Sequence, residues 1–258
     1  MTTAHLHTHA ANVRVVLADP TRVYASVIPH AIIKHPPLIF DFSLGSTALA
    51  DLELHNTEAA TAVLQQELAE AHAVFGIGKY AEDRSVYRSS ALFTGEGEPR
   101  SIHLGIDCWV RAGTPVFTPL PGRVHSVQDN DHFLDYGPTI ILEHGIDGVQ
   151  FFTLYGHLSR SSLKHLAVGQ PIAQGEQIAQ VGQNNENGQW PPHLHFQIVT
   201  DMLGNSGDYP GVAAPSQKDY WLTLCPDPNL ILRIPALTGA RGRDRTSDPV
   251  DVNDVLYH

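Results

Sequence analysis

The sequence has little cysteine, little positive charge and no long apolar run. Only two cysteines, Cys108 and Cys225, occur among its 258 residues, too few for a disulfide framework or a cysteine-based zinc ribbon. Any bound metal must therefore be held by histidine and carboxylate side chains. No stretch reaches the roughly 18 apolar residues of a membrane helix, so we expect no membrane partner. The first twenty residues lack the cationic leader and apolar run of a secretory signal, which predicts a cytoplasmic protein.

The charge balance excludes another class of partner. Twenty-seven Asp and Glu residues oppose 16 Lys and Arg residues, for a formal net charge of −11. Nucleic acids are bound through clustered cations, so we expect no nucleic-acid partner. The 16 histidines are the most unusual feature of the composition, because histidine is the commonest metal ligand and titrates near neutral pH.

The N-terminal part of the chain shows two kinds of periodicity. Residues 12–54 alternate short apolar runs with proline and glycine, which predicts short strands and turns. Over residues 56–75 the apolar side chains recur every three or four positions, which predicts a helix. Asn56 is placed to cap the start of this helix and Gly76 to end it.

The rest of the chain predicts a mainly β protein with some α structure. Residues 100–200 carry short apolar runs with turn signals about every ten residues, typical of an antiparallel sandwich or open barrel. An N-terminal α+β segment (1–99) would pack on this central domain, followed by a C-terminal extension (201–237) and a loose, charged tail (238–258). A short helix is expected around Gln217–Leu224.

Three short motifs bring histidine and aspartate into positions from which they can act together. His103 and Asp107 flank a glycine, and a bend there would turn both side chains toward one point. His193 and His195 alternate in a predicted strand, so both imidazoles share one face. His157 ends another strand-like run. Each histidine alone is more often structural, but their joint presence predicts one mixed His/Asp site.

These motifs resemble a known family. HLGID, YGHL and PPHLHFQI occur in the order and approximate spacing of the lysostaphin-type (LytM-like) zinc metallopeptidases. The resemblance covers about residues 100–200. It implies a small antiparallel β fold with a narrow groove, and an activity on peptide cross-links of bacterial peptidoglycan.

The resemblance also implies roles for five residues. His103, Asp107 and His195 would bind one Zn²⁺ ion, and His157 and His193 would be catalytic, although the sequence does not assign the base. Three such ligands leave a fourth position for water, as in catalytic zinc sites. The alternative is a non-catalytic, metal-stabilised module that binds a ligand or partner protein. Such members typically lack some of these residues, whereas all five are present here.

The flanking segments indicate a different kind of substrate. Residues 76–87, 207–216 and 225–232 resemble those around the metallopeptidase-like module fused to class III aminotransferases and aminoglycoside-kinase-like domains. This resemblance implies a functional link to an aminotransferase or a kinase-like protein. It also implies a cytoplasmic peptide or small amide as substrate.

Four further residues are candidates for substrate binding. Tyr80 and Arg84 precede the first motif, where Arg84 could pair with a substrate carboxylate; a solvated surface is the alternative. Asn184 and Trp190 belong to the polar loop 184–192 before the HLH strand. We choose this loop as the specificity determinant over the segments 129–136 and 159–165. For Trp190, packing beneath the loop is the alternative.

Overall fold

The computed structural model describes residues 3–43, 46, 49, 52, 56–84 and 97–238. The predicted tail therefore lies outside the described residues, apart from Thr238. In chain order the helices and strands are α1 (Thr3–Ala18), α2 (His30–Ile33), β1 (Leu38–Phe40), α3 (Thr57–Glu70), β2 (Gly76–Gly78), β3 (Ile102–His103), β4 (Ile106–Trp109), β5 (Pro115–Phe117), β6 (Gly122–Asn130), β7 (Gly137–Ile146), β8 (Val149–Gly156), η2 (Arg160–His165), β9 (Pro171–Ile172), β10 (Gln177–Gln180), β11 (Leu194–Val199), β12 (Val212–Ala213), η3 (Pro215–Gln217), α5 (Lys218–Leu224), α6 (Asn229–Leu232) and α7 (Pro235–Thr238).

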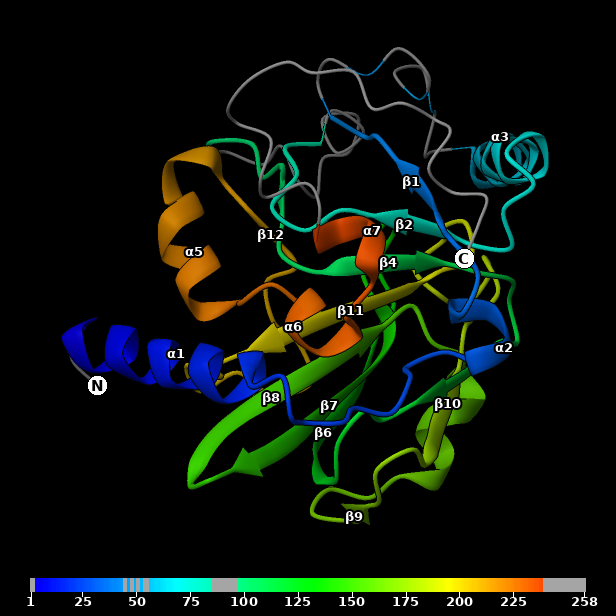
Figure 1. Cartoon of the computed structure of the whole chain (residues 1–258). Helices are drawn as coiled ribbons and strands as arrows, with labels where there is room; N and C mark the ends of the chain where they lie inside the picture. The colour runs from blue at the N-terminus through cyan, green and yellow to red at the C-terminus, as the bar shows by residue number, and fades with distance from the viewer. Residues whose placement is uncertain are drawn as a thin grey trace, which may run out of the picture.

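An eight-stranded sheet in the order β1-β2-β4-β11-β8-β7-β6-β9 carries the fold (Figure 1). Strands β1 and β2 pair in parallel, and the other pairs of this sheet are antiparallel. Two smaller sheets consist of β10 with β5 and of β12 with β3. The predicted mainly β class with some helix is confirmed. No helix among the described residues is long and apolar enough to cross a membrane.

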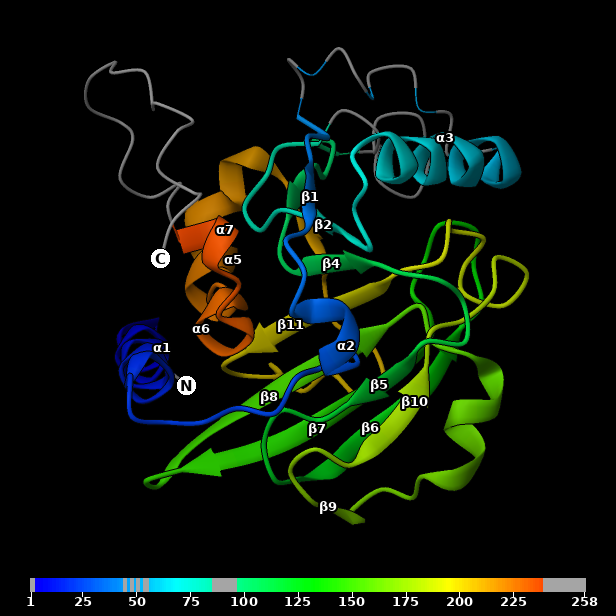
Figure 2. The same ribbon diagram turned by 45° about the vertical axis from the view of Figure 1, so that its right-hand side comes forward.

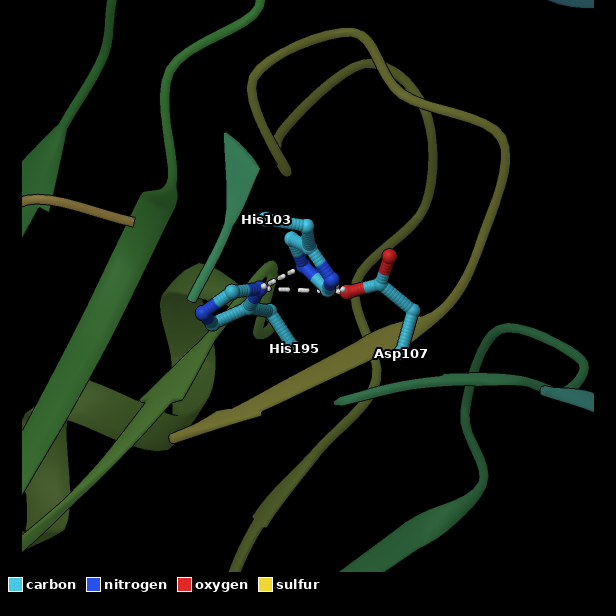
Figure 3. Close-up of side chains that lie close together, drawn as sticks. All are labelled: His103, Asp107 and His195. Atoms are coloured by element: carbon cyan, nitrogen blue, oxygen red, sulfur yellow. Dashed lines mark hydrogen bonds and ion pairs between the residues drawn. The ribbon is translucent and has the colours of Figure 1, made fainter. Parts of the chain in front are cut away.

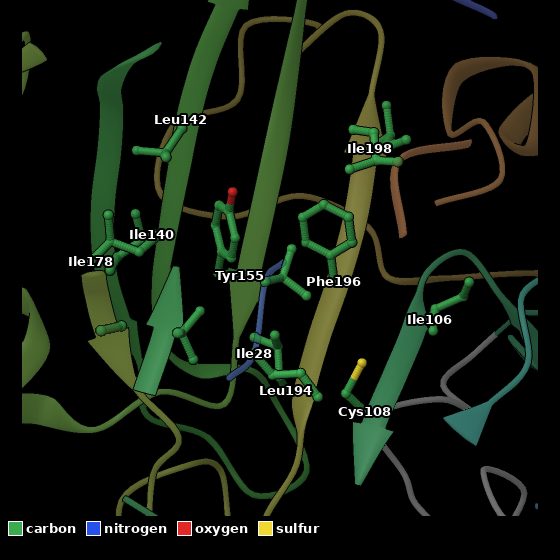
Figure 4. Close-up of a cluster of buried hydrophobic side chains, with 14 of the residues drawn as sticks. Ile28, Ile106, Cys108, Ile140, Leu142, Tyr155, Ile178, Leu194, Phe196 and Ile198 are labelled. Atoms are coloured by element: carbon green, nitrogen blue, oxygen red, sulfur yellow. The ribbon is translucent and has the colours of Figure 1, made fainter. Parts of the chain in front are cut away.

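The main core lies on one face of the sheet (Figure 4). Leu194, Phe196 and Ile198 of β11 are fully buried there beside Tyr155 of β8. Because side chains alternate along a strand, the residues between them in β11 point to the opposite face. Cys108 of β4 also lies in this core, where burial raises the pKa of its thiol to about 12.

The segments before and after the central strands contribute to the same core. Val13 and Leu17 of α1, with Ile231 of α6 and Ile234, pack among the strand residues. Helix α1 contacts β8, α5 and α6. In both views these three helices lie together and α3 lies apart from them (Figures 1 and 2). Helix α5 confirms the helix expected around Gln217–Leu224.

The strands expected over the first part of residues 12–54 are wrong, because this part lies in or just after helix α1. Ala10, Val13 and Leu17 are fully buried and follow helical spacing. The β-branched valines of this segment favour strands locally, and packing of the apolar stripe on the sheet overrides that preference. Of the strands expected before residue 54, β1 is the one that the described residues contain.

The helix predicted for residues 56–75 is confirmed as α3, with an earlier end. The side chain of Asn56 accepts a hydrogen bond from the backbone N–H of Ala59 at 3.2 Å, as a cap should. The helix ends before His72, which takes a left-handed φ of 52°. Gly76 does not end the helix; it begins β2, where an added Cβ would lie 2.2 Å from the ring of Phe40.

One buried histidine of the sheet makes stability depend on pH. Burial lowers the pKa of His144 in β7 to about 4, whereas histidine in an unfolded chain has a pKa of about 6.5. Unfolding therefore takes up a proton, and the folded state loses stability as the pH falls from 6.5 to 4. We expect His144 to lower the urea-measured free energy of unfolding by about 3 kcal/mol over this range.

A His144→Gln variant should lose this part of the pH dependence. Replacement of the exposed His132 by Gln is the matched control and should leave the pH dependence of the unfolding free energy unchanged. Equal slopes of the unfolding free energy against pH for wild type and His144→Gln would contradict the prediction.

Candidate metal centre and active site

Strand register brings the predicted site residues together. His195 of β11 pairs directly with Asp107 of β4 on one side and with Gly156 of β8 on the other. His157 follows Gly156 at the end of β8. The chain bends between β3 and β4, so that His103 faces the same point (Figure 3). Residues that are 92 positions apart in the chain thus become neighbours.

Three buried side chains converge at nearly equal distances. His103 Nε2 lies 3.1 Å from His195 Nδ1 and 3.2 Å from Asp107 Oδ1, and His195 Nδ1 lies 3.1 Å from Asp107 Oδ1 (Figure 3). All three residues are at most 3% exposed. Ligand atoms about 2.0–2.2 Å from a tetrahedral zinc ion would be separated by about 3.4 Å. The triangle therefore has nearly the size that such an ion requires.

The outer hydrogen bonds of the two histidines show which ring nitrogens carry protons. His103 Nδ1–H donates to the carbonyl oxygen of Lys79 at 2.9 Å. His195 Nε2–H donates to Gln197 Oε1 at 2.9 Å, because Gln197 uses its Nε2 to donate to the Pro210 carbonyl. In the neutral imidazoles, the nitrogens that face Asp107 therefore carry lone pairs. Three acceptors at hydrogen-bond distance with no proton between them favour a bound cation.

Interactions with neighbouring side chains keep the aspartate ionised. Burial alone would raise the pKa of Asp107, but its interactions with His103 and Arg84 hold that pKa well below the usual value. Arg84 donates to Asp107 Oδ2 at 2.6 Å and to Glu82 at 3.1 Å. Burial, with the positive charge of Arg84, lowers the pKa of His103 to about 4, so its imidazole is neutral at pH 7.

Two glycines make this packing sterically possible. Gly78 pairs with Asp107 across β2 and β4, and a Cβ at Gly78 would lie 2.6 Å from Arg84 Nη2 and 3.0 Å from Asp107 Oδ2. A Cβ at Gly105 would lie 2.5 Å from His195 Cε1. Any larger residue at either position would displace a metal-facing side chain or its partner.

Two more histidines lie beside the triangle with their lone pairs available. His157 Nδ1–H donates to the Asn187 carbonyl at 3.0 Å, and His193 Nδ1–H donates to the Pro191 carbonyl at 2.8 Å. Their ring centroids are 4.2 Å apart, and His193 Nε2 is 3.9 Å from Asp107 Oδ1. Burial lowers the pKa of His193 to about 4 and that of His157 well below 6.5. Both Nε2 atoms can therefore accept protons.

The site opens into a pocket of about 280 Å³. His103, His157 and His195 line it, together with the rings of Tyr136 and Trp190. Trp190 Nε1–H donates to the carbonyl of Asp135, which fixes the indole beside His157. A substrate in this pocket would therefore contact aromatic side chains as well as the histidines.

The four predicted substrate contacts are separated in the structure. Trp190 lines the pocket, whereas Asn184 lines a different depression beside α3. The hydroxyl of Tyr80 donates to a backbone carbonyl of the C-terminal extension at 2.6 Å. Arg84 is 2% exposed and contacts Asp107, so its guanidinium neutralises a candidate metal ligand instead of facing the pocket.

Two residues that contact the site histidines were missed from the sequence. Gln197 comes two positions after His195 in β11, and Trp109 comes two positions after Asp107 in β4. The alternation that placed His193 and His195 on one face would have identified both. Tyr136, at the end of the candidate segment 129–136, lines the pocket, a position that it reaches through tertiary packing.

The five site residues lie in a region that matches a known family. Residues 101–206 match peptidase family M23. This match supports a peptidase-type hydrolase, and we call residues 101–206 the M23 region. The suggested link to an aminotransferase or kinase-like protein finds no support in the match and stays a prediction. A search among curated proteins gave no match.

Several solved peptidase structures resemble part of the chain. A zinc-containing peptidase from Vibrio cholerae is 28% identical over 38% of this chain, with a TM-score of 0.32, and the similar part spans 27% of that protein. The catalytic domain of lysostaphin from Staphylococcus simulans is 24% identical over 47% of this chain and 80% of its own, with a TM-score of 0.34. The catalytic domain of the prophage-encoded M23 protein EnpA from Enterococcus faecalis, solved as a point mutant, is 22% identical over 43% of this chain and 78% of its own, with a TM-score of 0.34.

The hydrogen bond between Gln197 and His195 generates a prediction. Replacement of Gln197 by Leu removes the acceptor that keeps the proton on His195 Nε2 and the lone pair on Nδ1. We expect zinc affinity, measured by competition with a chromogenic chelator, to fall by about 10–100-fold. Gln180→Leu, at an exposed position of β10, is the control. Equal zinc affinity in Gln197→Leu and wild type would show that this contact does not orient the ligand.

Proposed function

We propose that the protein is a zinc-dependent hydrolase of peptide or amide bonds. The observation that carries the proposal is the triangle of His103 Nε2, Asp107 Oδ1 and His195 Nδ1, with edges of 3.1–3.2 Å. Two imidazoles and one carboxylate are ligands that zinc commonly takes in catalytic sites. The match of the M23 region to a peptidase family supports the same reaction class.

The chain supplies proton transfer from two histidines. When bound, zinc would polarise the scissile carbonyl and acidify water. The Nε2 atoms of His157 and His193 can take a proton during attack and return it to the leaving amine. Backbone carbonyls accept from both Nδ1–H groups, so each ring keeps its orientation when it becomes an imidazolium.

The two histidines differ in how a substrate can approach them. His157 lines the pocket, whereas His193 does not. His157 also has a left-handed φ of 61°, a conformation that is strained for a residue with a side chain and is concentrated at functional sites. We infer that His157 contacts the reacting group directly from the pocket, and that His193, whose ring lies against that of His157, acts from the side away from the pocket.

A non-catalytic binding module is the alternative. It would need the three metal-facing residues but not two further histidines whose Nε2 atoms have no hydrogen-bond partner among the described residues. Burial of polar side chains normally requires hydrogen bonds, and each of these two imidazoles leaves Nε2 available at the site. This arrangement favours catalysis over simple ligand binding.

The substrate class is open to direct measurement. Peptidoglycan, short glycine- or D-alanine-containing peptides, and small amides should be offered to wild type and to His193→Ala. We expect hydrolysis of at least one class by wild type, with a loss of rate in the variant. Hydrolysis of peptidoglycan alone would support a cell-wall role, and hydrolysis of small amides alone would support the predicted cytoplasmic role. No hydrolysis by the zinc-loaded protein would favour the binding module.

Metal analysis tests the zinc site itself. Protein purified without a histidine tag or added zinc should contain about one equivalent per chain by elemental analysis, because three preformed ligands bind the ion. His103→Ala should lose it and keep its circular dichroism spectrum. Less than about a tenth of an equivalent in folded wild type would contradict the proposal.

Separate loss of activity tests the catalytic pair. His157→Ala and His193→Ala should each retain zinc and lose hydrolytic rate by about 10²–10⁴-fold, the usual contribution of general acid–base catalysis. The measurement is kcat on the best substrate of the screen, with zinc content determined on the same sample. Full turnover in either variant would remove that histidine from the mechanism.

A further inference from the structure

Access to the candidate active site is one-sided in the described residues. The pocket of about 280 Å³ reaches His103, His157 and His195, but neither His193 nor Asp107 lines it. His193 is 3% exposed and Asp107 is 1% exposed. A substrate entering through this pocket therefore meets the site from one direction and finds the opposite side covered.

Trp109 forms the cover on the His193 side. Its indole stacks on the His193 imidazole, with ring centroids 4.1 Å apart and an interplanar angle of 22°. Phe42 packs against the same indole at 5.6 Å, and Phe40 meets it edge-on at 6.2 Å. Trp109 is 4% exposed, so aromatic rings from β1 and the following residues hold it in place.

A second cavity begins immediately behind this indole. Trp109 lines a cavity of about 550 Å³, together with Leu64 and Leu68 of α3 and with Pro192. Pro192 directly precedes His193 in the chain. The indole thus has His193 on one face and belongs to the wall of this second cavity. Without the side chain of Trp109, the cavity and the metal site would adjoin.

We propose that Trp109 is a partition that restricts the enzyme to compact substrates, namely small amides and the terminal residues of peptides. The inference rests on the hydrolase function proposed above. Cleavage within a long chain requires room for residues on both sides of the scissile bond, and Trp109 occupies that room on the His193 side. The open pocket, at about 280 Å³, lies at the lower limit of the roughly 300–1,000 Å³ of small-molecule sites.

The charged residues that line the pocket do not favour one end of a peptide over the other. Arg100 lines the pocket with Asp135 and Asp208, so groups of both signs are present in its lining. Burial, with the nearby charge of Asp208, raises the pKa of Asp135. The pocket charges therefore select neither the N-terminus nor the C-terminus of a peptide, and Trp109 restricts the substrate in both cases.

The wild-type protein provides the first test. Zinc-loaded enzyme is incubated with a mixture of 4- to 12-residue peptides with free ends, and with the same peptides acetylated at the N-terminus and amidated at the C-terminus. Mass spectrometry identifies each cleaved bond. We expect cleavage within about two residues of one terminus and none at the interior of doubly blocked peptides. Interior cleavage of blocked peptides at a comparable rate would overturn the partition, whereas no cleavage of any peptide or small amide would overturn the proposed function itself.

Removal of the indole provides the second test. Trp109→Ala should raise the ratio of interior to terminal cleavage by at least about tenfold, because the second cavity then accepts the chain beyond the scissile bond. Leu68→Ala enlarges the same cavity without removing the partition, and should leave the ratio unchanged. Folded, zinc-loaded Trp109→Ala with a wild-type ratio would overturn the proposal.

A chemical probe reports the same partition without any turnover. Diethyl pyrocarbonate modifies accessible imidazoles, and peptide mapping locates the modified residue. We expect modification of His193 to be faster in Trp109→Ala than in wild type or in Leu68→Ala. If Trp109→Ala does not fold, Trp109→Leu keeps an apolar side chain of smaller size and takes its place in both tests. An unchanged rate of His193 modification in the folded variant would contradict the shielding role of Trp109.

Discussion

The pairing of His195 with Asp107 across β11 and β4 is the contact on which the site depends. It places an imidazole and a carboxylate side by side on the face of the sheet away from the main core. The same alternation that buries Leu194 and Phe196 therefore presents the metal-facing atoms. Stability and chemistry are coupled in these strands, since a shift of register by one residue would send the ligands into the core and the apolar residues out of it.

The groups around His103, Asp107 and His195 leave the atoms that face one another without protons. Each ring or carboxylate makes its outward hydrogen bond to a fixed group: the Lys79 carbonyl, the Gln197 amide or the Arg84 guanidinium. The lone pairs are thereby directed inward. Outer contacts of this kind orient ligands and tune a bound metal, and here they come from residues 79–84 and from β11.

Much of this site was predictable from sequence, because its residues belong to short motifs. The spacing of His103 and Asp107 and the alternation of His193 and His195 are read within a few residues. The N-terminal helix α1 was not predicted, because its valines favour strands and its helical stripe becomes meaningful only once a sheet exists to cover it. The positions of Arg84, Trp109 and Tyr136 depend on contacts between segments far apart in the chain, which no short pattern contains.

The core shared by α1, the strands and α6 connects the terminal segments to the strands that carry the site. The core extends beyond the M23 region, because Val13, Leu17 and Ile231 lie outside that region and pack in the same core as its strands. β2, outside that region, is hydrogen-bonded to the strand of Asp107. Recombination that transferred the M23 region alone would leave apolar surface bare and an edge of the sheet unpaired. The terminal segments therefore stabilise the fold that holds the site.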